Sequence, residues 1–117
     1  MDLTQEQKSE QTLLDRLYAR FEHFYDLDPN LTLSHIMGLL YIKQHQDRLE
    51  GVTNSDLTEK LVLSPSGATR IIYYWEDIHG FLETKIDQKD RRRRLLRLTA
   101  NGEEFIALYI RKTHGNV

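Results

Sequence analysis

A chain of 117 residues with 39% hydrophobic and 29% charged residues can bury one modest core and is too apolar to be disordered. It contains no cysteine, which excludes disulfides, thiolate metal sites and a cysteine redox switch. No apolar run approaches the roughly 20 residues needed to span a membrane, and the N-terminus lacks a signal-peptide pattern. We therefore expect a single cytoplasmic domain over residues 1–117, with no membrane partner.

The net charge of −2 conceals an uneven distribution along the chain. Residues 1–30 carry three Lys or Arg against seven Asp or Glu, whereas residues 85–97 carry seven against two. The second segment includes four consecutive arginines, Arg91–Arg94. Because the local field steers a polyanion more than the net charge does, this segment is the candidate surface for nucleic acid.

Apolar residues at spacings of three and four predict a long amphipathic helix over residues 4–26, which ends before Pro29. The apolar stripe includes Leu13, Leu17 and Phe21. A helix of this length, roughly 30 Å, is longer than a small domain needs to cover its own core. The excess apolar surface indicates a partner chain.

Two further helices follow. Thr32 or Ser34 can cap a helix that runs to about His45 and is apolar on nearly every face, as in a central buried helix. Asn54 or Ser55 can cap a third, short helix.

The pair Ser64-Pro65 then supplies an N-cap residue and a proline at the first helical position. The fourth helix runs from there to about His79, and Gly80 is suited to the left-handed residue after its end. Its predicted inner face consists of Ala68, Ile71, Ile72, Trp75 and Ile78.

A β-hairpin is predicted after Gly80. Residues 80–84 resemble a strand entry, residues 85–90 form a polar turn, and Arg91–Arg94 occupy the tip and the return strand. Thr99 can cap a fifth helix to about Lys112, whose apolar residues spread over more than one face.

This order predicts a mainly α fold with a small β-hairpin wing, a winged helix-turn-helix. The start of the fourth helix must approach base edges in the major groove. Ser64, Ser66 and Thr69 can donate to phosphate or base there, and Arg70 can bind either. Backbone amides at the helix start also favour a phosphate oxygen. A basic hairpin beside such a helix makes double-stranded DNA the expected partner.

These residues resemble the MarR family of winged-helix transcription regulators. Residues 56–64 look like the first helix of the DNA-reading pair, and Thr69-Arg70 look like the centre of the recognition helix. Residues 87–92, followed by Leu-Thr-x-x-Gly at 98–102, look like the wing signature. The resemblance covers about residues 31–106 and the first helix loosely.

The resemblance implies a homodimer that binds a near-palindromic DNA site and regulates transcription. Arg92 matches the wing arginine that enters the minor groove, and Asp90 matches the acid that orients it. Lys89, Arg91 and Arg94 are further wing candidates, although alternation along a strand prevents all four consecutive arginines from facing DNA.

Three departures from the family are apparent. Val62 stands where glycine is frequent, so we expect the turn to be built differently. The fourth helix is one residue longer before Gly80. Only one helix follows the wing, as in compact SarA-type relatives, so dimerisation through the terminal helices would rest on Leu13, Leu17, Phe21, Phe105, Leu108 and Tyr109. This shortening leaves binding of a small-molecule effector open.

The predicted organisation is an N-terminal dimerisation helix at 1–30, a winged helix-turn-helix at 31–98 and a C-terminal helix at 99–117. The main rival function is a winged-helix protein-interaction module, and a replication or partition factor would share the same chemistry. Tyr73-Tyr74-Trp75 could stack single-stranded bases, but the spacing of Trp75 favours the core. Five histidines without an i,i+4 pair favour no metal site, and no catalytic motif is present, so we expect neither an enzyme nor a cofactor.

Overall fold

The computed structural model describes residues 4–114, which divide into two compact units. We call them the terminal-helix unit, which comprises the described residues up to Leu31 and from Phe105 onward, and the winged-helix unit, Thr32–Glu104. None of the helices within residues 4–114 has both the length and the hydrophobicity needed to cross a lipid bilayer.

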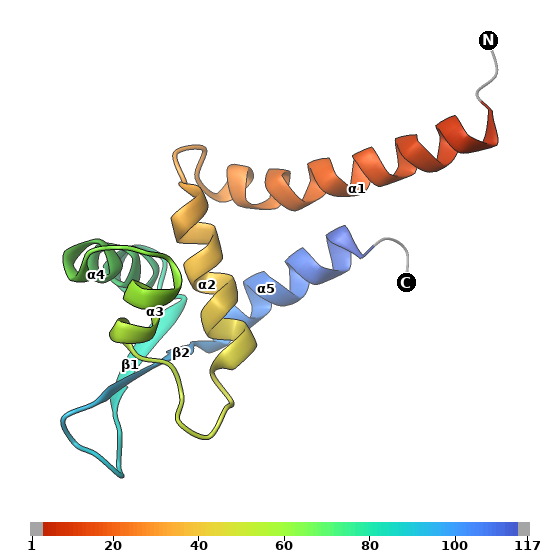
Figure 1. Ribbon diagram of the computed structural model, residues 1–117. Coiled ribbons are helices and arrows are strands. Elements are labelled where there is room, and N and C mark those ends of the chain that lie inside the picture. The colour runs from red at the N-terminus through yellow and green to blue at the C-terminus, as the bar shows by residue number, and fades with distance from the viewer. Residues whose placement is uncertain (1–3, 115–117) are drawn as a thin grey trace. The chain divides into compact units, whose positions relative to one another are not determined.

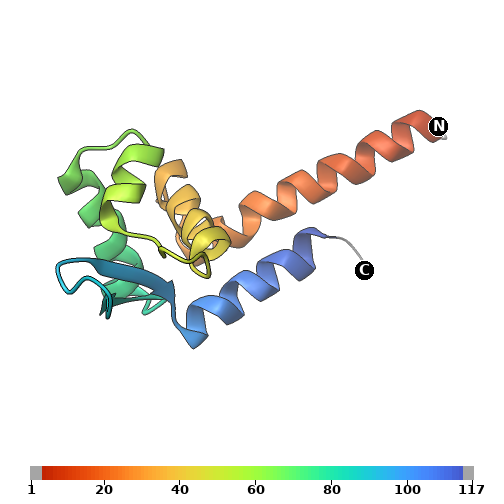
Figure 2. The ribbon, with the colours of Figure 1, turned by 60° about the horizontal axis from the view of Figure 1, so that its bottom comes forward.

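The terminal-helix unit contains α1, Gln5–Leu27, and most of α5, Ala100–Thr113. α1 runs as one uninterrupted helix (Figure 2), as predicted, and a capping box fixes its start. The Thr4 hydroxyl accepts a hydrogen bond from Gln7 N at 3.1 Å, and the Gln7 side chain accepts one from Thr4 N at 2.9 Å. These bonds satisfy backbone amides that helix geometry leaves without an intrahelical partner.

An aromatic cluster holds α1 and α5 together within this unit. The ring of Phe24, which is 1% exposed, lies 5.4 Å from the ring of Phe105 and 4.9 Å from that of Tyr109. His23 is buried beside them, with its Nε2 3.1 Å from the carbonyl oxygen of Phe105. Burial lowers the pKa of His23, although the bond to the Phe105 carbonyl opposes this shift.

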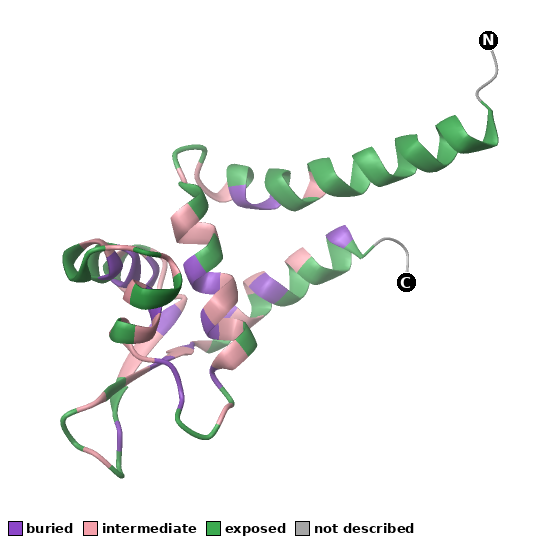
Figure 3. Ribbon diagram, in the orientation of Figure 1, coloured by how far each residue is buried: buried purple, intermediate pink, exposed green. Residues whose placement is uncertain are grey.

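Most of α1 outside this cluster is exposed (Figure 3). Four of the six residues predicted for a partner interface lie between 37% and 62% exposed: Leu13, Leu17, Phe21 and Leu108. The other two, Phe105 and Tyr109, are half-buried in the aromatic cluster. The two ends of the chain therefore present an apolar surface that the described residues leave uncovered.

The winged-helix unit consists of helices, a hairpin and the start of α5 (Figure 1), which confirms the predicted fold class. Its elements are α2 (Leu33–His45), α3 (Asn54–Lys60), α4 (Pro65–Tyr73), the π-helical turn η1 (Tyr74–Ile78), β1 (Leu82–Ile86) and β2 (Arg94–Leu98). All of them contribute to one core, whose buried apolar residues are Leu39, Ile42, Val52, Leu57, Ala68, Ile71, Ile72, Trp75, Leu82, Leu96 and Leu98.

The cap of α3 differs from the prediction, which named Asn54 or Ser55. Thr53 is the N-cap residue: its hydroxyl accepts from Asp56 N at 3.3 Å, and Asp56 Oδ2 accepts from Thr53 N at 2.8 Å. This reciprocal pairing satisfies two backbone amides at once. The Asn54 side chain instead reaches Thr69 on α4.

The turn between α3 and α4 uses Val62 in the left-handed conformation, with a φ of 52°. The expectation of a differently built turn is therefore wrong, even though a β-branched residue disfavours this region. Leu63 N donates to Thr58 O at 3.0 Å and closes the end of α3 in the manner of a Schellman motif. Val62 is 90% exposed, so its side chain gains almost no packing to offset the strain.

The helix predicted over residues 64–79 is present, but its last turn is not α-helical. α4 continues directly into η1, and a π turn accommodates an extra residue, which accounts for the additional length before Gly80. The wider turn leaves Ile78 59% exposed, so its assignment to the inner face is wrong. Trp75 is fully buried, as predicted, and its Nε1 donates to His35 O at 2.9 Å.

β1 and β2 pair in antiparallel fashion, with Leu82 opposite Leu98 and Thr84 opposite Leu96. The alternation of strand side chains places the three leucines on the buried face. Leu96 N also donates to Val52 O at 2.8 Å, which joins the segment before α3 to the edge of the hairpin. The loop between the strands extends away from the helices of this unit (Figure 1).

The buried amide of Gln46 connects three elements of the winged-helix unit. Its Nε2 donates to Glu103 at the start of α5 at 2.6 Å, and its Oε1 accepts from Leu98 N at the end of β2 at 2.9 Å. Lys43 Nζ lies 2.6 Å from the second Glu103 oxygen. Burial raises the pKa of Glu103, but the bonds from Lys43 and Gln46 outweigh it and hold the pKa below its usual value.

Gly102 lies where the start of α5 crosses the residue before β1. Thr99 caps α5 as predicted, since its hydroxyl accepts from Gly102 N at 3.2 Å, and Thr99 N donates to Phe81 O at 3.0 Å. A Cβ on Gly102 would lie 2.2 Å from Phe81 O, which is closer than real Cβ atoms approach. The glycine of the Leu-Thr-x-x-Gly pattern is thus required by this crossing.

Replacing Val62 by glycine should stabilise the protein by about 1 kcal/mol. A left-handed L-residue costs roughly 1–2 kcal/mol, and the greater freedom of glycine in the unfolded chain offsets part of the gain. Urea unfolding at fixed protein concentration should show a higher midpoint. Val62→Ala is the control, because it keeps the Cβ and should change the midpoint much less. A lower midpoint for Val62→Gly would contradict the strain at this turn.

His23 should make the protein lose stability in mild acid. Its lowered pKa means that the folded protein resists a proton that the unfolded chain accepts once the pH falls below about 6.5. His23→Gln keeps a donor for the Phe105 carbonyl but does not titrate. The variant should therefore lose less folding stability than the wild type between about pH 7.5 and 5.5. Thermal unfolding at those pH values checks this, and an equally steep loss in the variant would exclude His23 as its source.

Candidate nucleic-acid interface

The start of α4 presents the four predicted recognition residues to solvent. Ser64, Ser66, Thr69 and Arg70 are all exposed. Ser64 is the N-cap residue, and its hydroxyl accepts a hydrogen bond from Gly67 N at 3.0 Å. Ala68, between them in sequence, is fully buried. α4 is therefore fixed by its cap and by its apolar side, which leaves its polar side facing outward.

The hydroxyl groups on this face already have internal partners. The Ser64 and Ser66 oxygens are 3.1 Å apart. The Thr69 hydroxyl donates to Pro65 O at 3.0 Å and accepts from Asn54 Nδ2 at 3.0 Å. The Arg70 side chain, by contrast, has no hydrogen bond or ion pair to any residue within 4–114. Of the four, the Arg70 side chain keeps all its donors for a ligand, one of the two serines keeps its hydroxyl hydrogen, and Thr69 keeps none.

The wing carries a second set of exposed cations: Lys89, Arg91, Arg92 and Arg94. Of these, Arg92 has its side chain held by an acid: its Nε lies 3.1 Å from Asp90 Oδ1 and its Nη2 lies 3.4 Å from Asp90 Oδ2. The same carboxylate accepts from Arg92 N at 3.1 Å, and these bonds lower the pKa of Asp90. The Arg92 side chain is nonetheless 91% exposed. Asp90 thus contacts Arg92 as the prediction requires and leaves its outer edge open.

Arg93 differs from its neighbours, because it folds back on the protein. Its Nη1 donates to Asp87 Oδ2 at 3.1 Å, and its Nη2 donates to Glu50 O at 2.9 Å. The Asp87 side chain is 11% exposed. Asp87 also accepts from Lys89 N at 2.9 Å, and its own amide donates to Arg93 O at 2.9 Å. This arrangement anchors the wing loop to the segment before α3, and it confirms that not all four arginines face outward.

Arg97 is also occupied within the unit. It donates to Gln46 O at 3.0 Å and to Asp47 Oδ1 at 2.9 Å. The basic segment thus separates into Arg93 and Arg97, which hold the hairpin in place, and the cations that remain available to a partner.

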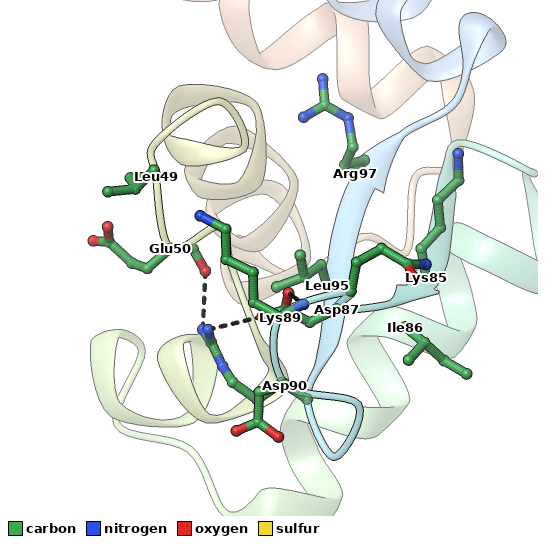
Figure 4. A pocket seen from close by; sticks show the side chains of 11 residues that line it. Leu49, Glu50, Lys85, Ile86, Asp87, Lys89, Asp90, Leu95 and Arg97 are labelled. Atoms are coloured by element: carbon green, nitrogen blue, oxygen red, sulfur yellow. Dashed lines mark hydrogen bonds and ion pairs between the residues drawn. The ribbon is translucent and has the colours of Figure 1, made fainter.

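Two hollows border the wing. One, of about 410 Å³, lies between the wing and α3 and is lined by Thr53, Asn54, Ser55, Arg92, Arg93 and Arg94. The other, of about 860 Å³, also borders Arg93, and there Leu49, Ile86 and Leu95 contribute apolar surface while Lys85, Lys89 and Arg97 contribute charge (Figure 4). The first brings wing arginines next to small polar side chains of α3.

The aromatic and histidine alternatives find little support in the geometry. Trp75 is buried and Tyr74 is half-buried with its hydroxyl 2.8 Å from His79 Nε2, so only Tyr73 of the aromatic trio is exposed, at 58%. Within residues 4–114 no three His, Asp or Glu side chains converge as metal ligands would.

Sequence reasoning missed two contributors to this surface. Asn54 reads as a helix cap, so its contact with Thr69 on the next helix is invisible without the α3–α4 packing. Glu50 acts through its backbone carbonyl, which carries no signal in the sequence.

The sequence matches no protein-family model and no curated protein, but solved structures match over most of the chain. The S. aureus MepR–DNA complex is 18% identical, with a TM-score of 0.63 over 88% of this chain and 77% of the other. E. coli MarR in its apo form is 16% identical, with a TM-score of 0.64 over 99% and 81%. RV1404 from Mycobacterium tuberculosis is 17% identical, with a TM-score of 0.69 over 97% and 76%.

These similarities show that the chain has the fold of the MarR-type winged-helix regulators. The predicted resemblance is confirmed at the level of the fold.

Replacing Arg93 by alanine should destabilise the protein by roughly 1–3 kcal/mol, because it leaves the Asp87 carboxylate with little solvent and no cation. The matched control is Arg91→Ala, which removes an exposed cation from the same loop and should change stability by less than about 0.5 kcal/mol. Urea unfolding measures both. Equal effects of the two substitutions would show that Arg93 is not the anchor of the wing.

Proposed function

We propose that this protein is a double-stranded DNA-binding transcriptional regulator, which acts as a homodimer on a near-palindromic site. In this proposal the start of α4 enters the major groove and the wing reaches the adjacent minor groove. Arg70 reads a base edge or binds phosphate, and Arg92 enters the minor groove under the control of Asp90. Lys89, Arg91 and Arg94 neutralise flanking phosphates.

The observation that carries this proposal is the division of cations within the winged-helix unit. The wing is anchored by Arg93 and Arg97, while Arg91, Arg92 and Arg94 remain exposed, as does Arg70 on α4. A purely structural charge run would give most of its arginines internal partners. Exposed guanidinium groups on an anchored loop suit the binding of a polyanion, because little further ordering is needed on contact.

The solved structures that resemble this chain support DNA binding in general, but not the particular residues or the dimer. Two of the matching structures are complexes of MepR with an oligodeoxyribonucleotide or DNA. A shared fold does not fix function, so the weight of the proposal rests on the residues of this chain.

The homodimer is proposed from the terminal-helix unit. Leu13, Leu17 and Phe21 recur every four residues on α1 and are exposed, and Leu108 adds exposed apolar surface on α5. A second copy of this unit would cover that surface, and two-fold symmetry would give two recognition helices. Half-sites about 34 Å apart, one turn of DNA, would then be read together.

Selection from random duplex DNA, with sequencing of the retained fragments across a salt series, tests this function. The regulator predicts an enriched inverted repeat with half-sites near one helical turn apart. Steep salt dependence without enrichment would favour an architectural or replication role. No binding at low salt would make a protein-interaction module the better reading.

Replacing Arg92 by alanine should weaken DNA binding broadly over sequences and lower the slope of log affinity against log salt by about one unit per lost phosphate contact. Filter binding or fluorescence anisotropy at several salt concentrations measures this. Lys8→Ala removes an exposed cation from α1 and serves as the control, for which we expect an unchanged slope. An unchanged affinity and slope in Arg92→Ala would remove the wing from the interface.

Replacing Leu17 by glutamate should convert the dimer to a monomer and reduce operator affinity on the order of a hundredfold, because two linked half-site contacts become independent. Gln11→Glu introduces the same charge elsewhere on α1 and should do neither. Analytical ultracentrifugation and operator titration report the two effects. A Leu17→Glu protein that stays dimeric would place the interface elsewhere.

A further inference from the structure

The hydroxyl of Thr69 is committed to bonds inside the protein. A threonine hydroxyl has one hydrogen and two lone pairs. The hydrogen is donated to Pro65 O at 3.0 Å, and one lone pair accepts from Asn54 Nδ2 at 3.0 Å. In this state Thr69 has no hydrogen left for a phosphate oxygen or for the acceptor atoms of guanine or thymine.

The Asn54 amide is oriented so that this arrangement persists. Its Oδ1 lies 3.2 Å from the Thr58 hydroxyl, whose single hydrogen is shared with the Asn54 backbone carbonyl oxygen at 3.0 Å, and its Nδ2 points toward α4. With the amide reversed, the single hydrogen of Thr69 would have to serve both Asn54 and Pro65 O. Only the observed orientation allows both bonds of Thr69 at once, and it fixes the rotamer of that side chain.

What Thr69 retains for a partner is chiefly its methyl group. The residue is exposed on the outer side of α4, next in sequence to Arg70, whose side chain has no partner within residues 4–114. In the major groove, thymine is distinguished by its C5-methyl group, and a threonine methyl is one of the side-chain groups that contact it. A side chain whose hydroxyl is held away is suited to that apolar contact.

We propose that Thr69 recognises a thymine methyl group in each half-site and that Asn54 is the residue that positions it. This inference rests on the proposed DNA-binding function and specifies its target chemistry: each half-site contains an A·T pair whose thymine faces Thr69. Arg70, one residue further, approaches the neighbouring base pair or phosphate.

Replacement of single thymines by deoxyuridine in the selected operator tests this inference, because that change removes only the C5-methyl group. The wild-type protein should lose about three- to fivefold in affinity at one thymine of a half-site, the value expected for one buried methyl group. Thr69→Val keeps the methyl and loses the hydroxyl, and valine in a helix strongly prefers a single rotamer without help from Asn54, so it should show the same loss. Thr69→Ser keeps the hydroxyl and loses the methyl, so it should bind thymine and uracil equally at that position.

The ratio of the affinity for thymine-containing operator to the affinity for deoxyuridine-containing operator also tests Asn54. In Asn54→Ala only the bond to Pro65 O still holds the Thr69 side chain, and threonine has two accessible rotamers in a helix, so the thymine-to-uracil ratio should fall while salt-dependent binding persists. A merely structural role would lower the affinity for both DNAs equally and leave the ratio intact.

Two outcomes would overturn the inference while leaving the regulator intact. In one, the operator binds but no thymine shows a methyl effect that depends on Thr69. In the other, Thr69→Ser keeps the discrimination and Thr69→Val loses it, which would assign the contact to the hydroxyl. Absence of salt-dependent DNA binding by the folded wild-type protein would instead overturn the proposed function itself. Circular dichroism of each variant separates a lost contact from a lost fold.

Discussion

The buried amide of Gln46 is the constraint on which the arrangement of the winged-helix unit depends. A side-chain amide that is 6% exposed must have partners for both its donor and its acceptor, and here they come from α5 and β2. The return strand of the wing and the start of the last helix are therefore fixed relative to the end of α2. Arg94 and the loop before it are held by a strand whose far end cannot move without leaving a buried polar group unpaired.

From that anchor the basic segment acquires its two roles. Arg97 and Arg93 use their guanidinium groups to join the hairpin to the segment between α2 and α3. The exposed cations Lys89, Arg91, Arg92 and Arg94 are left to solvent. Of these four, Arg92 is directed by Asp90 on its own loop. The number of arginines says little about binding here. Which carbonyls and carboxylates lie within reach of each one decides whether it holds the fold or is available to a partner.

Much of this could be predicted from the sequence, because caps, glycines and apolar periodicity act locally. The proline at the start of α4, the left-handed Gly80 and the Thr99 cap all follow from such signals. The failures come from interactions between elements. Asn54 reads as a cap but binds Thr69, Val62 accepts a conformation that its side chain opposes, and Ile78 leaves the inner face because an extra residue widens its turn.

The π turn at the end of the fourth helix uncouples the length of the helix from the orientation of its residues. In a regular helix an added residue rotates everything beyond it by about 100°. Here the extra residue is absorbed in η1, after the outward-facing positions and before the hairpin. The helix can therefore vary in length at its far end while Trp75 stays in the core and residues 64–70 keep their orientation. Residues 64–70 thus form a segment whose orientation is set by the Ser64 cap on one side and is insulated from changes in helix length by the π turn on the other.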